Sequence, residues 1–247
     1  MHYYKQGGFN MIYGVILAGG IGSRMGNVEK PKQYLNIGNK PIIIHTIEKF
    51  CICNEFEKIL VLCPEEWIEY TTDLIQKYIP LEKRINVLIG GDTRNETIMN
   101  AIQYLENNEE LDDDTILLTH DAVRPFVTNR IIEENIEKVK QYGACDTVIP
   151  ATDTIVESLD KQIISGIPNR AVLYQGQTPQ SFNASKLKYL YEGLTVQEKE
   201  SLTDAAKIFT LKGEKVYLVS GETFNIKITY PYDIAVAEAL LKGEIKC

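Results

Sequence analysis

The sequence predicts an α/β fold with a Rossmann-like, doubly wound and mostly parallel sheet, from which a β-arm projects. Short apolar runs of strand length alternate with helical stretches through the first half of the chain, as in successive βαβ units. These runs are continuously apolar, which is typical of strands buried on both faces of a parallel sheet. A length of 247 residues suits one large domain. We therefore expect a single domain at residues 11–247, preceded by a leader at residues 1–10.

Four apolar runs are the predicted strands of this sheet. They begin at Ile12 (IYGVIL), Lys58 (KILVLC), Ile85 (INVLIG) and Thr115 (TILLTH). Helical stretches lie between them. Because connections between parallel strands are nearly always right-handed, the helices should cover the two faces of a doubly wound sheet.

Three of the predicted helices begin with residues that favour a helix start. Pro41 suits the first turn of PIIIHTIEKF. Thr93 and Glu96 have the spacing of a capping box at the start of RNETIMNAIQYLEN. Pro231 and Asp233 likewise suit the first turn of the last helix.

The segment at about 145–170 is the predicted arm. Between Cys145 and Arg170 the helical period is lost and β-branched residues are frequent. Because Val and Ile side chains on a projecting arm are unfavourable in water, we expect the arm to pack on a second copy of the chain. The alternative is that the segment only extends the domain's own sheet. In the dimer, Arg170 would complete the neighbouring subunit's site.

Composition excludes several classes of function. The formal net charge of −8 argues against a nucleic-acid partner, which needs a basic face. No apolar run approaches the roughly 20 residues of a membrane span. Residues 1–10 lack the apolar centre of a signal peptide. The five cysteines are scattered without zinc-site spacing, so we expect reduced thiols in a cytoplasmic protein.

The first predicted strand runs into a glycine-rich loop, LAGGIGSRMG, at residues 17–26. A loop at the carboxyl end of a parallel strand lies where such sheets bind ligands, and its glycines let backbone amides approach a phosphate. The loop is not a P-loop, because the chain has no G-x-x-x-x-G-K-[ST]. A dinucleotide fingerprint would need glycine in place of Met25, and the second strand ends in cysteine and proline without a clear acidic residue.

Three basic residues are candidates for binding the phosphates of a ligand. Two of them follow the glycine-rich loop, and the third lies in an apolar stretch near the end of the chain. Arg24 and Lys32 follow the glycines closely, and two fixed charges beside an amide-lined loop suit a polyphosphate whose charge changes during a reaction. Lys227, in FNIKITY, lies among apolar and β-branched residues, where an unpaired ammonium would be unfavourable.

The string LAGGIGSRMG, with PKQ after it, resembles the signature of the sugar-phosphate nucleotidyltransferases, and within them the polyol-phosphate cytidylyltransferases. The resemblance covers residues 11–243 and continues in order through GGDTRNETI, HDAVRPF, DTI, QGQTPQSF, TDAA and NIKITYPYD. It implies a nucleotidyltransferase-type sheet, CTP and a polyol phosphate as substrates, and Mg²⁺ or another divalent cation as cofactor.

Two acceptors are known within this family. LAGG, RNETIMN, HDAVRPF and YQGQTPQSF are more similar to the enzymes for D-ribitol 5-phosphate, which make CDP-ribitol for teichoic-acid-type cell-surface polymers. The alternative is 2-C-methyl-D-erythritol 4-phosphate, used in isoprenoid precursor synthesis. Enzymes for that acceptor usually have Ala-Ala-Gly in the first motif, where this chain has Leu17, and an acidic residue where it has Ala205. A nucleotide-binding regulator without turnover and a dehydrogenase are more distant alternatives.

The resemblance also implies roles for residues in the matching motifs. The catalytic residues would be Arg24, Lys32, Arg170 and Lys227. CTP would contact residues of the first and second motifs and one residue after the fourth strand, namely Leu17, Ala18, Gly19, Gly20, Gly22, Gly91, Asp92, Thr93, Arg94, Asn95, Glu96, Thr97 and Ala122. The acceptor would contact Arg124, Thr154, Thr178 and Thr203, and Mg²⁺ would bind Asp121.

Simpler structural roles remain open for some of these residues. Asp121 at a strand end suits Mg²⁺ and Arg124 suits a phosphate, yet the two could also form a purely structural pair. A capped helix start alone would explain Thr93 and Glu96. His120 is expected to be a packed or hydrogen-bonding residue rather than a base, because the expected chemistry needs none.

Overall fold

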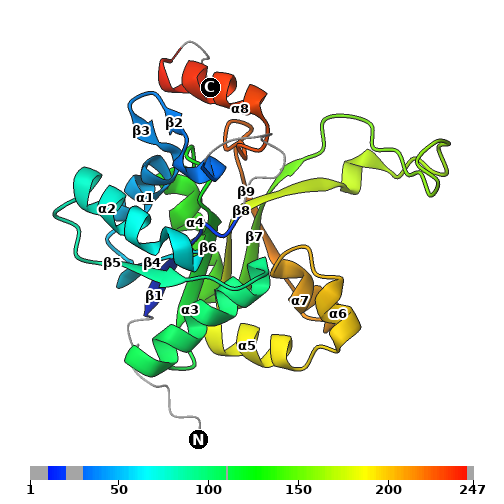
Figure 1. Cartoon of the computed structure of the whole chain (residues 1–247). Helices are drawn as coiled ribbons and strands as arrows, with labels where there is room; N and C mark the ends of the chain where they lie inside the picture. Colours follow the sequence, from blue (N-terminus) through cyan, green and yellow to red (C-terminus); the bar gives the residue numbers. More distant parts are fainter. Residues whose placement is uncertain (1–10, 21–29, 110, 244–247) are drawn as a thin grey trace, which may run out of the picture.

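A seven-stranded sheet forms the centre of this computed structural model, which describes residues 11–20, 30–109 and 111–243 (Figure 1). The strands lie in the order β5-β4-β1-β6-β8-β7-β9. They are β1 (Ile12–Leu17), β4 (Lys58–Cys63), β5 (Ile85–Ile89), β6 (Ile116–Asp121), β7 (Ala144–Pro150), β8 (Tyr174–Asn183) and β9 (Tyr217–Ser220). Only β8 runs antiparallel to its neighbours, so the predicted mostly parallel sheet is confirmed.

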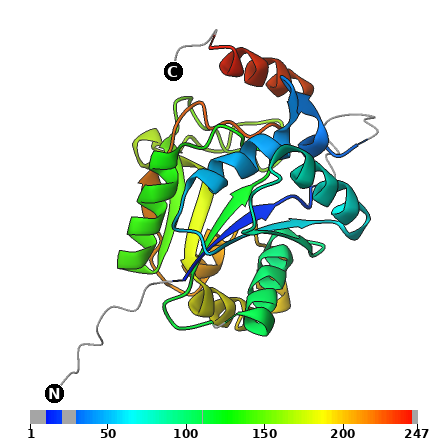
Figure 2. The ribbon, with the colours of Figure 1, turned by 90° about the vertical axis from the view of Figure 1, so that its left-hand side faces the viewer.

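Helices cover both faces of the sheet, as Figure 2 shows. One face packs against α1 (Ile42–Ile52), α2 (Ile68–Tyr78) and α4 (Asn129–Tyr142). The other packs against α3 (Arg94–Asn108), α5 (Ala184–Glu192) and α7 (Ala206–Leu211), with α6 (Val196–Glu200) before α7. Side chains alternate between the two cores along β1, β4 and β6, with Ile16 in the first core and Val15 in the second. The predicted doubly wound arrangement is confirmed.

Of the helix starts predicted from the sequence, two are confirmed and one is shifted. At α1 the helix begins one residue later than predicted, because Pro41 is the last residue of β3 (Lys40–Pro41) and occupies the cap position before Ile42. Thr93 and Glu96 form a complete capping box at α3, since each accepts a hydrogen bond from the other's backbone N–H. The final helix, α8 (Pro231–Leu241), begins with proline, and the Asp233 carboxylate accepts from the backbone N–H of Tyr230.

The four predicted strands are also present, as β1, β4, β5 and β6. The expectation that each is buried on both faces is wrong for β5. It is an edge strand paired only with β4, and Ile89 at its end is 52% exposed. A continuous apolar run is therefore not enough to distinguish an edge strand from a central one.

The predicted arm at 145–170 is present but begins later than expected. Residues 145–150 belong to β7, because this stretch pairs with β8 on one side and β9 on the other. Residues 151–173, called the arm below, project beyond the paired ends of β7 and β8 (Figure 1). Its two limbs meet at a bridge between Glu157 and Gly166. The segment thus extends the domain's own sheet at its start and projects from it afterwards.

A small third core lies between the short hairpin β2 (Asn36–Ile37) and β3 (Lys40–Pro41) and the last helix, α8. It contains Val123, from the loop after β6, and Ile228, whose backbone N–H donates to Val123 O at 3.0 Å. This packing brings the segment before α8 to the carboxyl ends of the central strands. No helix in the described ranges is long and apolar enough to cross a bilayer.

Candidate active site

A cavity of about 430 Å³ opens at the carboxyl ends of β1 and β6, and we call it the strand-end pocket. In open α/β sheets ligands bind at this edge, where neighbouring strands connect in opposite directions along the sheet. The loops after the strands keep the strand spacing, since Ala18 N–H donates to Leu62 O and Ala122 N–H to Leu17 O. The pocket is lined by Leu17, Ala18, Gly19, Gly20, Lys32, Gln33, Gly91, Asp92, Thr93, Arg94, Thr97, Asp121, Ala122, Val123 and Lys227.

One wall of the pocket is the segment between β5 and α3. The backbone N–H of Gly91 donates to Thr97 Oγ1 at 3.0 Å, which folds the segment back onto the first turn of α3. A Cβ on Gly91 would lie 2.5 Å from Glu96 Cβ, so only glycine allows this close approach. The amino end of α3 therefore faces the pocket and adds the positive end of its dipole to the wall.

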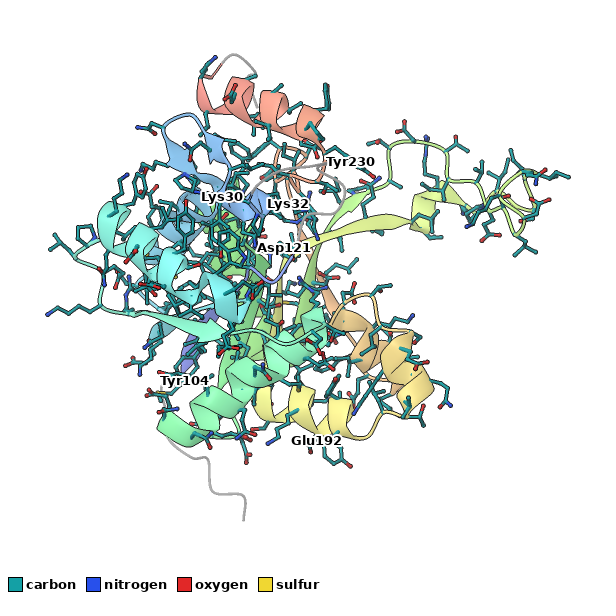
Figure 3. All side chains as sticks on the ribbon, viewed as in Figure 1. Lys30, Lys32, Tyr104, Asp121, Glu192 and Tyr230 are labelled. Atoms are coloured by element: carbon teal, nitrogen blue, oxygen red, sulfur yellow. The ribbon has the colours of Figure 1, made fainter. Side chains whose placement is uncertain are left out.

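A second wall is the short 3-10 helix Lys32–Tyr34. Lys32 lines the pocket although its side chain is largely buried. The next residue, Gln33, donates from its side chain to Ala18 O at 2.7 Å. Tyr34 stacks on Trp67 of the neighbouring segment at 4.9 Å between ring centroids. These contacts fix Lys32 between the β1 loop and α2, and Figure 3 shows it at the same end of the sheet as Asp121.

Asp121, at the end of β6, is surrounded by cations. Its carboxylate pairs with Arg94, with Lys227 Nζ at 3.0 Å and with Arg124 Nε at 3.4 Å. Burial alone would raise the pKa of Asp121, but the three cations outweigh it and hold that pKa well below its usual range. One carboxylate thus faces three cations, and the excess positive charge favours an anionic ligand.

Behind Asp121 lies a buried hydrogen-bonded support. The Arg124 guanidinium donates to Asn225 O at 2.8 Å, and its pocket-side contact is Asp121. His120 Nε2 lies 3.0 Å from Arg124 O, so this nitrogen is the protonated one, and Nδ1 accepts from the Thr178 hydroxyl at 2.9 Å. Burial lowers the pKa of His120 to about 4, so the ring is neutral near pH 7. As expected, His120 is a packed, hydrogen-bonded residue.

Comparison with known proteins identifies the family. Residues 12–243 match the 2-C-methyl-D-erythritol 4-phosphate cytidylyltransferase family, IspD. The chain belongs to this family. It is accordingly a nucleotidyltransferase that transfers a cytidylyl group from CTP to a polyol phosphate.

Solved structures of family members share the fold. The chain is 28% identical to the 4-diphosphocytidyl-2C-methyl-D-erythritol synthase of Anaerococcus prevotii, with a TM-score of 0.77 over 95% of this chain and 97% of that one. It is 27% identical to the Francisella tularensis 2-C-methyl-D-erythritol 4-phosphate cytidylyltransferase, with a TM-score of 0.77 over 92% and 98%. The Thermus thermophilus enzyme of the same name is 25% identical, with a TM-score of 0.68 over 92% and 98%.

The strand-end pocket of this cytidylyltransferase brings together most of the residues expected to bind CTP. Residues from the β1 loop, the α3 start and β6 share its lining with Lys32 and Lys227. Asn95 and Glu96 do not line it, because Asn95 is buried on α3 and Glu96 completes the capping box. Gly22 and Arg24 lie outside the described residues.

The residues expected to bind the acceptor are not gathered in this pocket. Arg124 and Thr178 lie in the buried support behind Asp121, where Arg124 occupies the structural pair that the sequence left open. Thr203 is exposed before α7. Thr154 and Arg170 are exposed on the arm, where Arg170 donates across the two limbs to Thr152 O at 2.7 Å. No residue of the arm is among the described residues that line the strand-end pocket of the single chain.

Sequence reasoning missed two lining residues, Gln33 and Val123. Gln33 follows Lys32 in the PKQ string. Nothing in the sequence indicates that this glutamine anchors the 3-10 helix. Val123 lies between Asp121 and Arg124 in the HDAVRPF motif, and an apolar residue there has no feature that predicts contact with a ligand. Both contribute position and shape rather than charge.

Proposed function

We propose that this cytidylyltransferase binds CTP in the strand-end pocket and uses D-ribitol 5-phosphate as acceptor, giving CDP-ribitol and pyrophosphate. The observation that supports the reaction is the charge arrangement of the pocket. Lys32, Arg94 and Lys227 line it together with the amino end of α3. Such fixed positive groups suit a triphosphate and the charge that develops on it during transfer.

The proposed step is an in-line displacement at the α-phosphorus of CTP. A phosphate oxygen of the acceptor forms the new P–O bond, and the bond from the α-phosphorus to the β-phosphate oxygen breaks, so that pyrophosphate leaves with the electron pair. The attacking oxygen is already ionised, so no base is needed, in keeping with the buried, neutral His120. Lys32 and Lys227 would align the two substrates and neutralise their repulsion.

We propose Mg²⁺ as the cofactor, with Asp121 as its protein ligand. Proteins commonly hold Mg²⁺ with one or two carboxylates and the substrate's phosphate oxygens, and Asp121 lines the pocket. No group of three or more potential metal-ligating side chains occurs in the described part of the chain, which fits a metal held chiefly by the triphosphate. When bound, Mg²⁺ would neutralise the charge on the phosphates, and Arg94 or Lys227 would have to release one Asp121 oxygen.

A second candidate acceptor is 2-C-methyl-D-erythritol 4-phosphate. The comparisons with known proteins support it better than ribitol 5-phosphate, because the matching family and the solved structures carry its name. Two positions favour ribitol instead. Leu17 lines the pocket where the methylerythritol enzymes usually have alanine. Ala205, where they usually have an acidic residue, is fully buried at the start of α7.

The acceptor is tested by measuring pyrophosphate release from CTP with each polyol phosphate in parallel. We expect kcat/KM to be higher for D-ribitol 5-phosphate. Because a single branching methyl changes binding by only about 1–3 kcal/mol, the second acceptor should show residual turnover. A higher kcat/KM for the methylerythritol compound would replace the proposed acceptor by the second candidate. CTP binding without release with either compound would contradict turnover altogether.

We also propose a cytoplasmic homodimer joined through the arm. Cys51, Cys53, Cys63 and Cys145 are free thiols, as is usual in the reducing cytoplasm. The arm exposes apolar side chains that a second copy could cover, namely Ile155, Val156, Leu159, Ile163, Ile164, Ile167 and Val172.

The dimer predicts two results. Changing both Leu159 and Ile163 to aspartate should convert a dimer into a monomer in analytical ultracentrifugation. If Arg170 completes the partner's site, an equimolar mixture of inactive Lys32→Ala and Arg170→Ala chains should regain activity, up to about a quarter of the wild-type value. About half of the dimers then contain one chain of each variant, and one of the two sites in each such dimer combines an intact Lys32 with an intact Arg170. A wild-type chain that sediments as a monomer would contradict the dimer.

A further inference from the structure

Next to the strand-end pocket lies a buried carboxylate that the proposed reaction does not use. Asp146, on β7, is only 8% exposed, and its Oδ1 has no hydrogen-bond partner among the described residues. Burial raises the pKa of Asp146 to about 7; the Gln180 hydrogen bond and Arg94 act in the opposite direction, and Asp204 adds to the increase. Burying a carboxylate without a directly paired cation is unfavourable, so its presence beside the pocket calls for an explanation.

Gln180 connects Asp146 to the pocket. The two residues lie opposite each other on the neighbouring strands β7 and β8, so their side chains are cross-strand neighbours, and the Gln180 amide lowers the pKa of the Asp146 carboxyl group as a hydrogen-bond donor does. A carboxylate accepts hydrogen bonds, so the NH₂ group of the Gln180 amide must face Asp146. The amide oxygen then faces away from Asp146, and it accepts from Arg94 at 3.3 Å.

Arg94 is held by few other contacts. One of its terminal nitrogens pairs with Asp121 and the other donates to Gln180, while its Nε has no hydrogen-bond partner in the part of the chain that the structure describes. The plane of the guanidinium is therefore set by Asp121 on one side and Gln180 on the other. A chain of contacts leads from Asp146 through Gln180 and Arg94 to Asp121, and it ends at the pocket lining.

We infer that Asp146 and Gln180 are positioning residues for Arg94. The Asp146 carboxylate fixes the orientation of the Gln180 amide, and Gln180 in turn holds the guanidinium at the pocket wall where it meets CTP. If that amide turned over, its NH₂ group would face the guanidinium, and two donors would oppose each other. The inference rests on the proposed function, because it concerns how Arg94 is presented to the nucleotide.

The first variant is Asp146→Asn, which keeps the shape of the side chain but can present a donor to Gln180. We expect kcat/KM for CTP to fall about tenfold and the Kd for CTP to rise, because Arg94 loses its fixed orientation. The stability of the variant should be unchanged or higher, since a buried charge is removed. Gln180→Glu should also lose activity, because its carboxylate would face that of Asp146.

The decisive variant combines Asp146→Asn with Gln180→Glu. The amide at position 146 can then donate to the carboxylate at 180, which still accepts from Arg94, so the contacts are restored with exchanged roles. We expect the double variant to recover most of the activity lost in either single variant. Asp112→Asn is the matched control, because it makes the same change far from the pocket. Asp112 precedes β6 at the opposite end of the sheet, where its carboxylate accepts a hydrogen bond from the Thr115 hydroxyl.

The pH dependence of CTP binding supplies a further measurement. Several polar groups in the described part of the chain act on Asp146, namely Arg94 on α3, Gln180 on β8, Asp204 before α7, the backbone N–H of Thr147, Arg124 after β6 and Cys145 on β7. Protonation near pH 7 would let the carboxyl group donate to Gln180 and turn its amide over. CTP affinity of the wild type should therefore fall more steeply below pH 7 than that of Asp146→Asn, a comparison that cancels the titration of CTP itself.

The outcomes distinguish a failure of this inference from a failure of the proposed function. Wild-type protein that releases no pyrophosphate with either acceptor would contradict the proposed function. Active wild-type protein together with an Asp146→Asn variant of unchanged kcat, KM and CTP Kd would overturn the positioning role. A double variant that recovers nothing would overturn it as well, because a merely structural carboxylate predicts additive losses.

Discussion

Replacing Lys32 with alanine should lower kcat for cytidylyl transfer about 10²- to 10³-fold, comparable to the loss of one oxyanion-stabilising donor. Lys32 is 7% exposed and lines the pocket, so its ammonium acts where little water screens it. Its neighbours on the 3-10 helix, Gln33 and Tyr34, are anchored independently by Ala18 and Trp67. The 3-10 helix should therefore keep its position without the Lys32 ammonium. The substitution should lower kcat and leave the free energy of unfolding nearly unchanged.

Lys30→Ala is the matched control for this prediction. Lys30 is two residues earlier, and its Nζ donates to the Tyr70 hydroxyl at 2.9 Å outside the pocket lining. Both variants remove one positive charge from the same short segment. Steady-state pyrophosphate release should separate them, with kcat nearly unchanged for Lys30→Ala. A folded Lys32→Ala variant with wild-type kcat would contradict the catalytic role of Lys32.

The fold and the centre of the pocket could be predicted from the sequence because they depend on local patterns. Continuous apolar runs identified β1, β4 and β6, and the Thr93–Glu96 spacing identified the start of α3. Loops at the carboxyl ends of parallel strands meet at one edge, so the motifs that follow these strands had to converge there. The topology alone therefore places Gly91 near Asp121.

Other features depend on pairings that no local pattern encodes. Residues 145–150 look the same in sequence whether they form an arm or a central strand, and only pairing with β9 decides between them. The sequence likewise places Arg124 in a phosphate-binding motif, whereas Asn225, 101 positions later, accepts its hydrogen bond. No local pattern predicts a role for Asp146, because its partners Gln180 and Arg94 lie on a strand and a helix that are distant in sequence.

The second large effect is a lower free energy of unfolding, which we expect for Asp121→Asn. Asp121 is the shared counter-ion of Arg94, Arg124 and Lys227, and the Arg124 guanidinium is buried behind it. Removing its charge leaves these cations to repel one another in a poorly solvated place. Breaking a buried ion pair in this way typically costs about 3–5 kcal/mol of unfolding free energy. Urea denaturation of the two proteins at pH 7 measures the difference.

The size of this difference should depend on pH in a definite direction. The cations hold the pKa of Asp121 below its usual range in the folded chain, whereas in the unfolded chain it returns to about 3.9. A depressed carboxyl pKa contributes stability that is fully present above the unfolded value and is lost as the pH falls below it. The difference between wild type and Asp121→Asn should therefore be constant from pH 7 to 5 and should shrink below about pH 4. Other carboxylates with lowered pKa, such as Glu82, are common to both proteins and cancel. Equal stabilities at pH 7, or a difference that persists undiminished at pH 3, would show that Asp121 is not the counter-ion on which these three cations depend.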